Sequence, residues 1–80
     1  MINNMYSNGF RIAVSPTEVQ IVFRIDTPKF DEEDKLVGVV REDLADVRMS
    51  PALTKKLRDS LDQQIIEYER VFGEIKMGDL

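Results

Sequence analysis

The chain has 80 residues, 42% of them apolar, and a net charge of −4 from 15 acidic and 11 basic residues. This length corresponds to one small domain, predicted over residues 1–80. The acidic balance argues against a nucleic-acid binder, which needs Lys and Arg to neutralise phosphates. Because the chain has no cysteine and no histidine, it forms no disulfide and lacks the commonest metal ligand and general base.

The sequence also bears on the compartment. No run of apolar residues approaches the roughly 18 needed to cross a bilayer. The first ten residues lack the basic start and apolar centre of a signal peptide. We therefore expect a cytoplasmic protein that does not associate with a membrane.

Two alternating segments predict an antiparallel hairpin. After a flexible N-terminus over residues 1–5, every second residue is apolar over residues 9–15 and again over 18–26. Such alternation is typical of half-buried strands. Pro16 ends the first segment, and only two or three residues join the two, so the strands are expected to pair.

The next part of the chain combines a loop and a third strand. The segment "TPKFDEEDK", residues 27–35, holds four consecutive acids and is predicted to be an acidic loop. Residues 36–49 then return to β-branched residues on both sides of a charged stretch at 41–43. They form either one long strand with a bulge there or two short strands around a turn, and we favour the long bent strand.

A helix is predicted over residues 51–72. Ser50 is suited to the N-cap position and Pro51 to the first helical position. Apolar residues then recur at steps of three or four, at Leu53, Leu57, Leu61, Ile65, Tyr68 and Phe72. Gly73 is suited to a left-handed C-cap, and Ile75 could fold back on the last turn as in a Schellman ending. Residues 76–80 are expected to be a tail.

The order of elements predicts an α+β fold, β-β-β-α, with a small antiparallel sheet of about three strands before one long helix. One helix covers roughly 10 Å of a sheet that is roughly 10–15 Å wide, so it shields one face only. The apolar residues left over predict a homodimer. The candidate interface residues are Val22, Leu44, Ile66 and Val71.

No catalytic, cofactor-binding or metal site is predicted, and no cofactor is expected. The acids at 31–34 lack the alternate spacing and central glycine of an EF-hand loop, so a solvated loop is favoured over a weak cation site. Ser15 and Ser50 lie in no nucleophile motif, and Ser50 is better explained as a helix cap.

Three arginines are candidate anion contacts. Arg11 and Arg24 fall on the less apolar face of their strands, and Arg48 lies near the helix start. Paired guanidinium groups can bind a phosphate or carboxylate. The alternative, which we favour, is that these arginines pair with the abundant acids nearby.

The residues also resemble a known family. The segment "RMSPALTKKLRDSLDQQIIEYERVFGEI", preceded by "GFRIAVSPTEVQIVFRID", is similar to small prokaryotic proteins described only as a domain of unknown function. The resemblance covers about residues 6–75 and rests on the Met49-Ser50-Pro51 start and the Y-E-x-x-F-G-x-I tail at 68–75. The acidic loop and "REDLAD" depart from it. The resemblance implies the fold but no activity.

The function expected from these observations is a non-enzymatic, acidic, homodimeric protein-interaction module or subunit with a probable protein partner. Two alternatives remain open. One is a phage-type acidic inhibitor of a host enzyme or defence protein, in which carboxylates imitate phosphates. The other is a binder of a small anion or nucleotide at the dimer groove, through Arg11 and Arg24.

Overall fold

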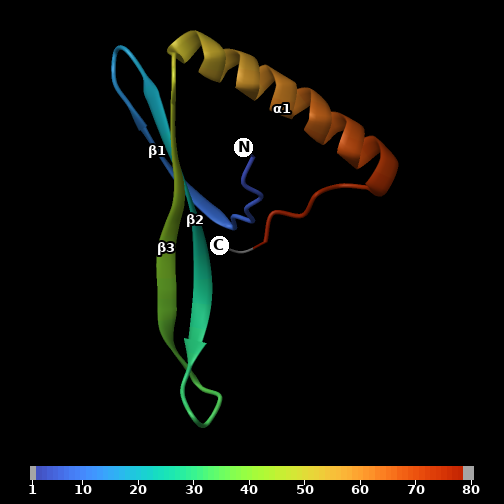
Figure 1. Cartoon of the computed structure of the whole chain (residues 1–80). Coiled ribbons are helices and arrows are strands. Elements are labelled where there is room, and N and C mark those ends of the chain that lie inside the picture. The colour runs from blue at the N-terminus through green and yellow to red at the C-terminus, as the bar shows by residue number, and fades with distance from the viewer. Residues whose placement is uncertain (1, 79–80) are drawn as a thin grey trace. The chain divides into compact units, whose positions relative to one another are not determined.

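The computed structural model describes residues 2–78 and divides the chain into two compact units, Met1–Ser50 and Pro51–Leu80. The elements follow in the order β1 (Gly9–Val14), β2 (Val19–Phe30), β3 (Leu36–Met49) and α1 (Pro51–Phe72) (Figure 1). The β-β-β-α order of an α+β fold is therefore confirmed. That both units form one domain stays a prediction.

The terminal segments that the sequence predicts reach past this range. The flexible N-terminus (1–5) and the tail (76–80) include residues 1, 79 and 80, which lie outside the described residues. No helix within residues 2–78 is long and apolar enough to span a membrane.

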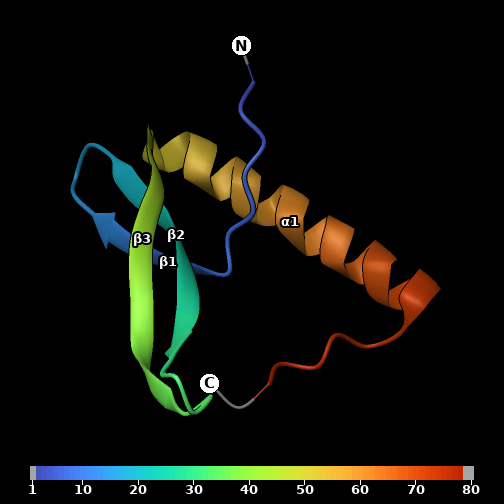
Figure 2. The ribbon, with the colours of Figure 1, turned by 60° about the horizontal axis from the view of Figure 1, so that its bottom comes forward.

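The sheet is antiparallel with the strand order β1-β2-β3. β1 pairs with the first part of β2, up to Arg24, whereas β3 pairs with β2 from Val19 to Phe30. β2 and β3 therefore extend beyond β1 as a two-stranded ribbon, which both views show (Figures 1 and 2). We call residues 25–42 the hairpin arm.

The hairpin between β1 and β2 turns at Pro16 and Thr17, as its short length requires. The Ser15 amide donates to the Glu18 carbonyl at 2.9 Å. The Ser15 hydroxyl accepts from the Glu18 amide at 3.2 Å and from the Thr17 amide at 3.4 Å. This serine therefore has a structural role in the turn.

β2 is longer than the sequence predicted. The expected strand ended at residue 26 and was followed by a loop over 27–35, but residues 27–30 continue β2 and only residues 31–35 form the loop. The prediction was wrong because Pro28 was treated as a strand breaker. Proline is tolerated on an exposed strand edge, where no ladder bond is lost.

The position of Pro28 explains this tolerance. The Asp26 amide and carbonyl both bond to the Asn8 side chain, so they point toward the β1 side of β2. Backbone groups alternate along a strand, so Pro28 points the same way as Asp26. Because β1 pairs with β2 only as far as Arg24, Pro28 lies on the open edge of the arm.

Residues 36–49 form one bent strand, as we favoured. The register of β3 shifts opposite the Phe23–Arg24 step, where Phe23 faces Ala45 and Arg24 faces Asp43. Leu44 is therefore the extra residue of a β-bulge. The odd-numbered residues of β3 therefore lie on one face of the sheet after Leu44 and on the opposite face before it.

The loop at the end of the arm is ordered by one acid. The Asp31 carboxylate accepts from the Glu33 amide at 2.8 Å and from the Lys35 amide at 3.0 Å. The Asp31 amide donates to the Lys35 carbonyl at 2.9 Å. Asp34 takes a left-handed backbone conformation with φ of 59°, which acidic and amide residues tolerate better than most.

The sheet has one apolar face, defined by alternate residues of the three strands. Its core is small: Val19 and Ile21 on this face are each 8% exposed, and Val22 on the other face is 4% exposed. The apolar face consists of Phe10, Ile12, Val14, Val19, Ile21, Phe23, Ala45, Val47 and Met49.

The helix begins at Pro51, directly after Ser50, and ends at Phe72, as predicted. Gly73 has a φ of 98°, and its amide donates to the Glu69 carbonyl at 3.0 Å. These are the features of an αL ending rather than of the expected Schellman ending. The Ile75 amide then donates to the Glu69 carboxylate at 2.9 Å.

Candidate functional site

The face of the sheet opposite the apolar face carries charge of both signs. The four arginines of the strands lie on it because they alternate with the apolar positions, and the bulge at Leu44 keeps Arg41 and Arg48 on the same side. Four acids accompany them. This ion-pair face consists of Arg11, Arg24, Arg41 and Arg48 with Glu18, Asp26, Asp43 and Asp46.

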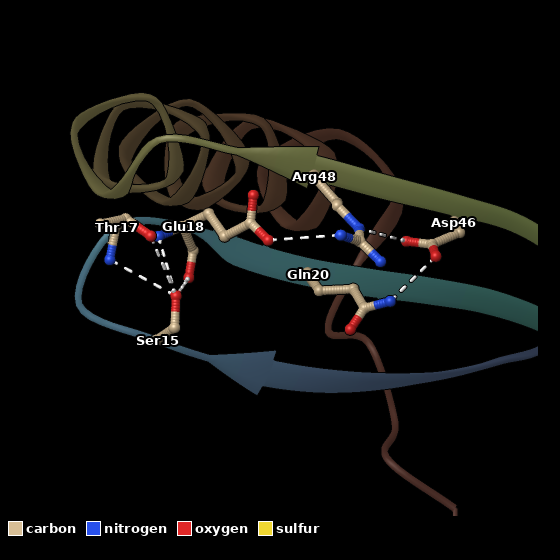
Figure 3. Close-up of polar contacts among 6 residues, drawn as sticks. All are labelled: Ser15, Thr17, Glu18, Gln20, Asp46 and Arg48. Carbon is tan, nitrogen blue, oxygen red and sulfur yellow. Dashed lines mark hydrogen bonds and ion pairs between the residues drawn. The ribbon is translucent and has the colours of Figure 1, made fainter.

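Arg48 lies between two carboxylates (Figure 3). Its guanidinium is 3.5 Å from Glu18 and 3.7 Å from Asp46. The Gln20 amide group donates to Asp46 at 2.9 Å. β2 and β3 are thus linked by side chains as well as by their backbones at this end of the sheet.

Arg24 and Asp26 form the least exposed ion pair of this face. Their nearest charged atoms are 3.6 Å apart and their side chains are 27% and 28% exposed. Gly9 lies opposite Arg24, and a Cβ there would stand 3.0 Å from the Arg24 Nε. The glycine therefore makes room for the arginine over β1. Arg41 approaches Asp26 at 3.7 Å from the other side.

The predicted anion contacts are thus all accompanied by carboxylates. Arg11 lies 3.9 Å from Asp43, and Arg24 and Arg48 have the partners given above. These are the contacts expected from the ion-pairing alternative. Exposed pairs of this kind add little stability, so their main effect is to neutralise the face.

The predicted interface residues of the sheet differ in exposure. Val22 is buried, because it lies on the central strand between Arg11 and Asp46 of the neighbouring strands. The prediction of an interface residue required Val22 to be exposed for contact with a second molecule, and it is not exposed. Leu44 is half-buried at the bulge.

Leu44 borders a hollow of about 410 Å³ in the sheet unit. Polar groups form only a minor part of its lining, which includes one serine and one asparagine. Its size lies within the range of small-molecule pockets, but it holds no charged side chain that would orient a ligand. The lining residues are Asn3, Met5, Ser7, Phe23, Leu44 and Ala45.

The hairpin arm exposes apolar side chains on both faces. A two-stranded ribbon buries little apolar surface by itself, so such ribbons are marginal on their own. Each of the following side chains is more than half exposed: Phe30, Leu36, Val37, Val39 and Val40.

The helix carries an apolar stripe along its whole length. None of its 22 residues is buried, and the apolar side chains along one side are between 37% (Leu57) and 74% (Phe72) exposed. The rings of Tyr68 and Phe72, one turn apart, contact each other in a tilted arrangement, with centroids 5.0 Å apart. The helix stripe consists of Leu53, Leu57, Leu61, Ile65, Tyr68, Val71 and Phe72.

The two predicted interface residues of the helix separate in space. Val71 follows Leu53 by about five turns and therefore belongs to the helix stripe. Ile66 points to the opposite side of the helix and is 66% exposed. The sequence analysis had grouped the two together.

On its polar side the helix contains an ion pair between Glu67 and Arg70, which are one turn apart. The Arg70 guanidinium holds the pKa of the Glu67 carboxyl below its ordinary value, and the Glu67 carboxylate raises the pKa of Arg70. Both groups are therefore charged at neutral pH. Over residues 2–78, no three acids are grouped as a metal site requires.

The sequence analysis missed Asn8 as a structural residue. Its side chain bonds to both backbone groups of Asp26, at 2.9 and 2.7 Å, and so continues the β1–β2 pairing by one residue. The Ser7 hydroxyl oxygen lies 2.7 Å from the carbonyl oxygens of both Gly9 and Arg24, and its one proton can be donated to either of them. The Asn8-Gly9 pair directly before the first alternating segment was the available signal.

One comparison identifies the family. A family model described as protein of unknown function (DUF3467) matches residues 1–77. No curated protein and no solved structure matches the chain. The match extends from the N-terminal strand past the αL ending of the helix, so it includes every element described above. The resemblance seen in the sequence is confirmed, and the chain belongs to the DUF3467 family.

Proposed function

We propose that the chain is a non-enzymatic, cytoplasmic protein-interaction module that works as a homodimer. The observation that supports this most is the helix stripe, an apolar surface along a 22-residue helix in which no residue is buried. Helices gain most of their stability from packing an apolar face, and large exposed apolar patches mark interaction sites. Closed two-fold dimers are the commonest way in which soluble chains pair.

The non-enzymatic part of the proposal is supported by the side chains available. The sequence has no histidine or cysteine. Without either, a nucleophilic serine needs a lysine or carboxylate base. Ser15 instead serves the β1–β2 turn, with its hydroxyl accepting from two backbone amides.

The ion pairs on the sheet speak against the anion-binding alternative. Each predicted contact, Arg11, Arg24 and Arg48, already has a carboxylate within 3.9 Å. An incoming phosphate would have to displace these acids and would also be repelled by them. The interaction-module reading avoids this difficulty.

Sedimentation equilibrium tests the homodimer. We expect a mass twice the 9.2 kDa of one chain at micromolar concentration. Leu61→Asp introduces a charge into the helix stripe and should shift the protein to monomer. Ile66→Asp is the matched control, because it places the same charge on the opposite side of the helix. A wild-type protein of single-chain mass at all concentrations would contradict the proposal.

A further inference from the structure

The charges of α1 are divided between its two ends. Residues 51–58 contain Lys55, Lys56 and Arg58 and no acid. Residues 59–72 contain four acids and one base. The acids of this second part are Asp59, Asp62, Glu67 and Glu69.

This division is unfavourable for an isolated helix. The backbone dipole makes the N-terminal end of a helix positive and its C-terminal end negative, so acids are favoured at the start and bases at the end. In α1 the first turn has no acid, and Arg70 is the one base in the acidic second part of the helix. Except for Arg70, the distribution of charge is therefore not explained by the stability of the helix alone.

Two pairs of residues in the helix stripe are equally distant from the point between residues 62 and 63. These pairs are Leu53 with Phe72 and Leu57 with Tyr68. Leu61 is related in the same way to Gln64, a polar residue that points in the direction of the stripe. Two copies of the helix side by side in opposite directions would place Leu57 against Tyr68 and Leu61 against Gln64.

The charges beside the stripe follow this symmetry to within one residue, because the midpoint of Lys56 and Glu67 lies one residue before its centre and that of Arg58 and Glu69 one residue after it. Lys56 and Glu67 lie on one side of the stripe, near opposite ends of the helix, and Arg58 and Glu69 lie on the other side. In an antiparallel pair, the side that carries Lys56 and Glu67 faces the same side of the second helix, and the two helices run in opposite directions. Each copy then brings Lys56 to Glu67 of the second copy, and Arg58 to Glu69 of the second copy.

A parallel pair would have the opposite result. In a parallel pair, the side of one helix that carries Arg58 and Glu69 faces the side of the second helix that carries Lys56 and Glu67. Because the helices run in the same direction, Arg58 would face Lys56 of the second copy. Glu69 would likewise face Glu67 of the second copy. Every such contact joins like charges, which disfavours this arrangement.

We propose that α1 is a homodimerisation helix that pairs antiparallel with α1 of a second copy across a two-fold axis between residues 62 and 63. This inference rests on the proposed homodimer and adds its surface and direction. Gln64 is the polar residue near the axis, and a polar residue at one core position fixes the register of paired helices.

Charge reversal with rescue tests the direction. The variant Lys56→Glu/Arg58→Glu and the variant Glu67→Lys/Glu69→Lys each place like charges in contact in the antiparallel pair. For each, the dissociation constant of the homodimer should rise by about tenfold or more. Combining all four substitutions reverses every pair and should return the dissociation constant to within about threefold of the wild type. Lys55→Glu, on the far side of the helix, is the control and should change it by less than about threefold.

The three variants also separate this inference from the homodimer itself. Circular dichroism checks that the helix forms in each variant. If a double variant loses helix, the fourfold variant still tests the antiparallel direction, because it restores opposite charges at every predicted contact. A dimeric wild type whose double variants dimerise equally well would overturn the helix pairing and leave the homodimer in place. A monomeric wild type would overturn both.

Disulfide formation gives a second, independent measurement, because the sequence has no cysteine of its own. In the antiparallel pair, Leu57→Cys and Tyr68→Cys should cross-link with each other when the two variants are mixed. Neither should cross-link with itself, because equivalent residues would be about 16 Å apart along the helix axis, beyond the roughly 7 Å that a disulfide spans. Efficient self-linking of Leu57→Cys would indicate a parallel pair and overturn the inference.

Discussion

In the sheet, Val19, Ile21 and Val22 are each no more than 8% exposed, whereas α1 has no buried residue along 22 positions. The sheet is held by ladders between strands that are distant in sequence and by cross-strand ion pairs. The helix is held by local signals, its proline start, its glycine ending and neighbouring charges. The comparison teaches that the sheet has a small core of its own, whereas the helix is defined by local signals without any buried residue.

The largest effect should come from the small core. Ile21→Ala removes a buried side chain and should lower the free energy of unfolding by about 2–4 kcal/mol. Ile12 lies directly opposite Ile21 but is 55% exposed, so Ile12→Ala should lower it by less than about 1 kcal/mol. Urea unfolding followed by circular dichroism measures both. Equal losses would mean that the apolar face is covered to the same degree at both positions.

The glycine at the helix end comes next. Gly73→Ala forces a side chain into a left-handed conformation with φ of 98° and should destabilise the helix by about 1–2 kcal/mol. Gly78, which has open space around it, is the control, and Gly78→Ala should leave the thermal midpoint unchanged. A midpoint that is the same in both variants would show that the αL ending contributes nothing to the helix.

A smaller effect is expected where Asn8 continues the β1–β2 pairing. Asn8→Ala removes two hydrogen bonds to the Asp26 backbone and should destabilise the sheet by about 1 kcal/mol. The more specific readout is faster hydrogen exchange of the Asp26 amide. Asn8→Asp keeps the acceptor oxygen and should preserve most of that protection. Unchanged exchange in Asn8→Ala would show that the contact does not persist in solution.

The smallest effect should be the pH dependence of the helix. Arg70 lowers the pKa of Glu67 in the folded state below the ordinary 4.5. The unfolded chain therefore takes up the proton first, and the contribution of Glu67 to stability is present above pH 4.5 and is lost as the pH falls through its lower folded pKa. Glu67→Gln should flatten the acid limb of helix content measured by circular dichroism. An unchanged acid limb would assign the loss to other carboxylates.

The sequence predicted the elements that depend on local patterns. The helix from Pro51 to Phe72 was found with both ends, because capping residues and the apolar period agree over its whole length. β1 was predicted one residue too long, and the single bent strand from Leu36 to Met49 was favoured correctly. The helix and β1 each have a continuous pattern of their own, whereas β3 was favoured as one strand although a charged stretch interrupts its pattern at 41–43.

What the sequence could not predict depends on the register between strands. The extension of β2 to Phe30 depends on which edge Pro28 occupies, and that is decided by the pairing of β1 several residues earlier. The burial of Val22 depends on Arg11 and Asp46, which lie opposite it on the neighbouring strands. The alternation of apolar residues along one strand does not predict which residues of the next strand lie opposite. Finding Asp43 as the ion partner of Arg11 likewise required the bulge at Leu44 to be located.

Pro28 has a further consequence for how the protein behaves at high concentration. A free strand edge is a template on which identical chains can stack into fibrils, and every backbone donor along it recruits the next molecule. At Pro28 that donor is missing, next to an amide that Asn8 already occupies. Stacking along this edge of the arm is therefore interrupted at its middle, and the protein should resist amyloid-like growth from this edge.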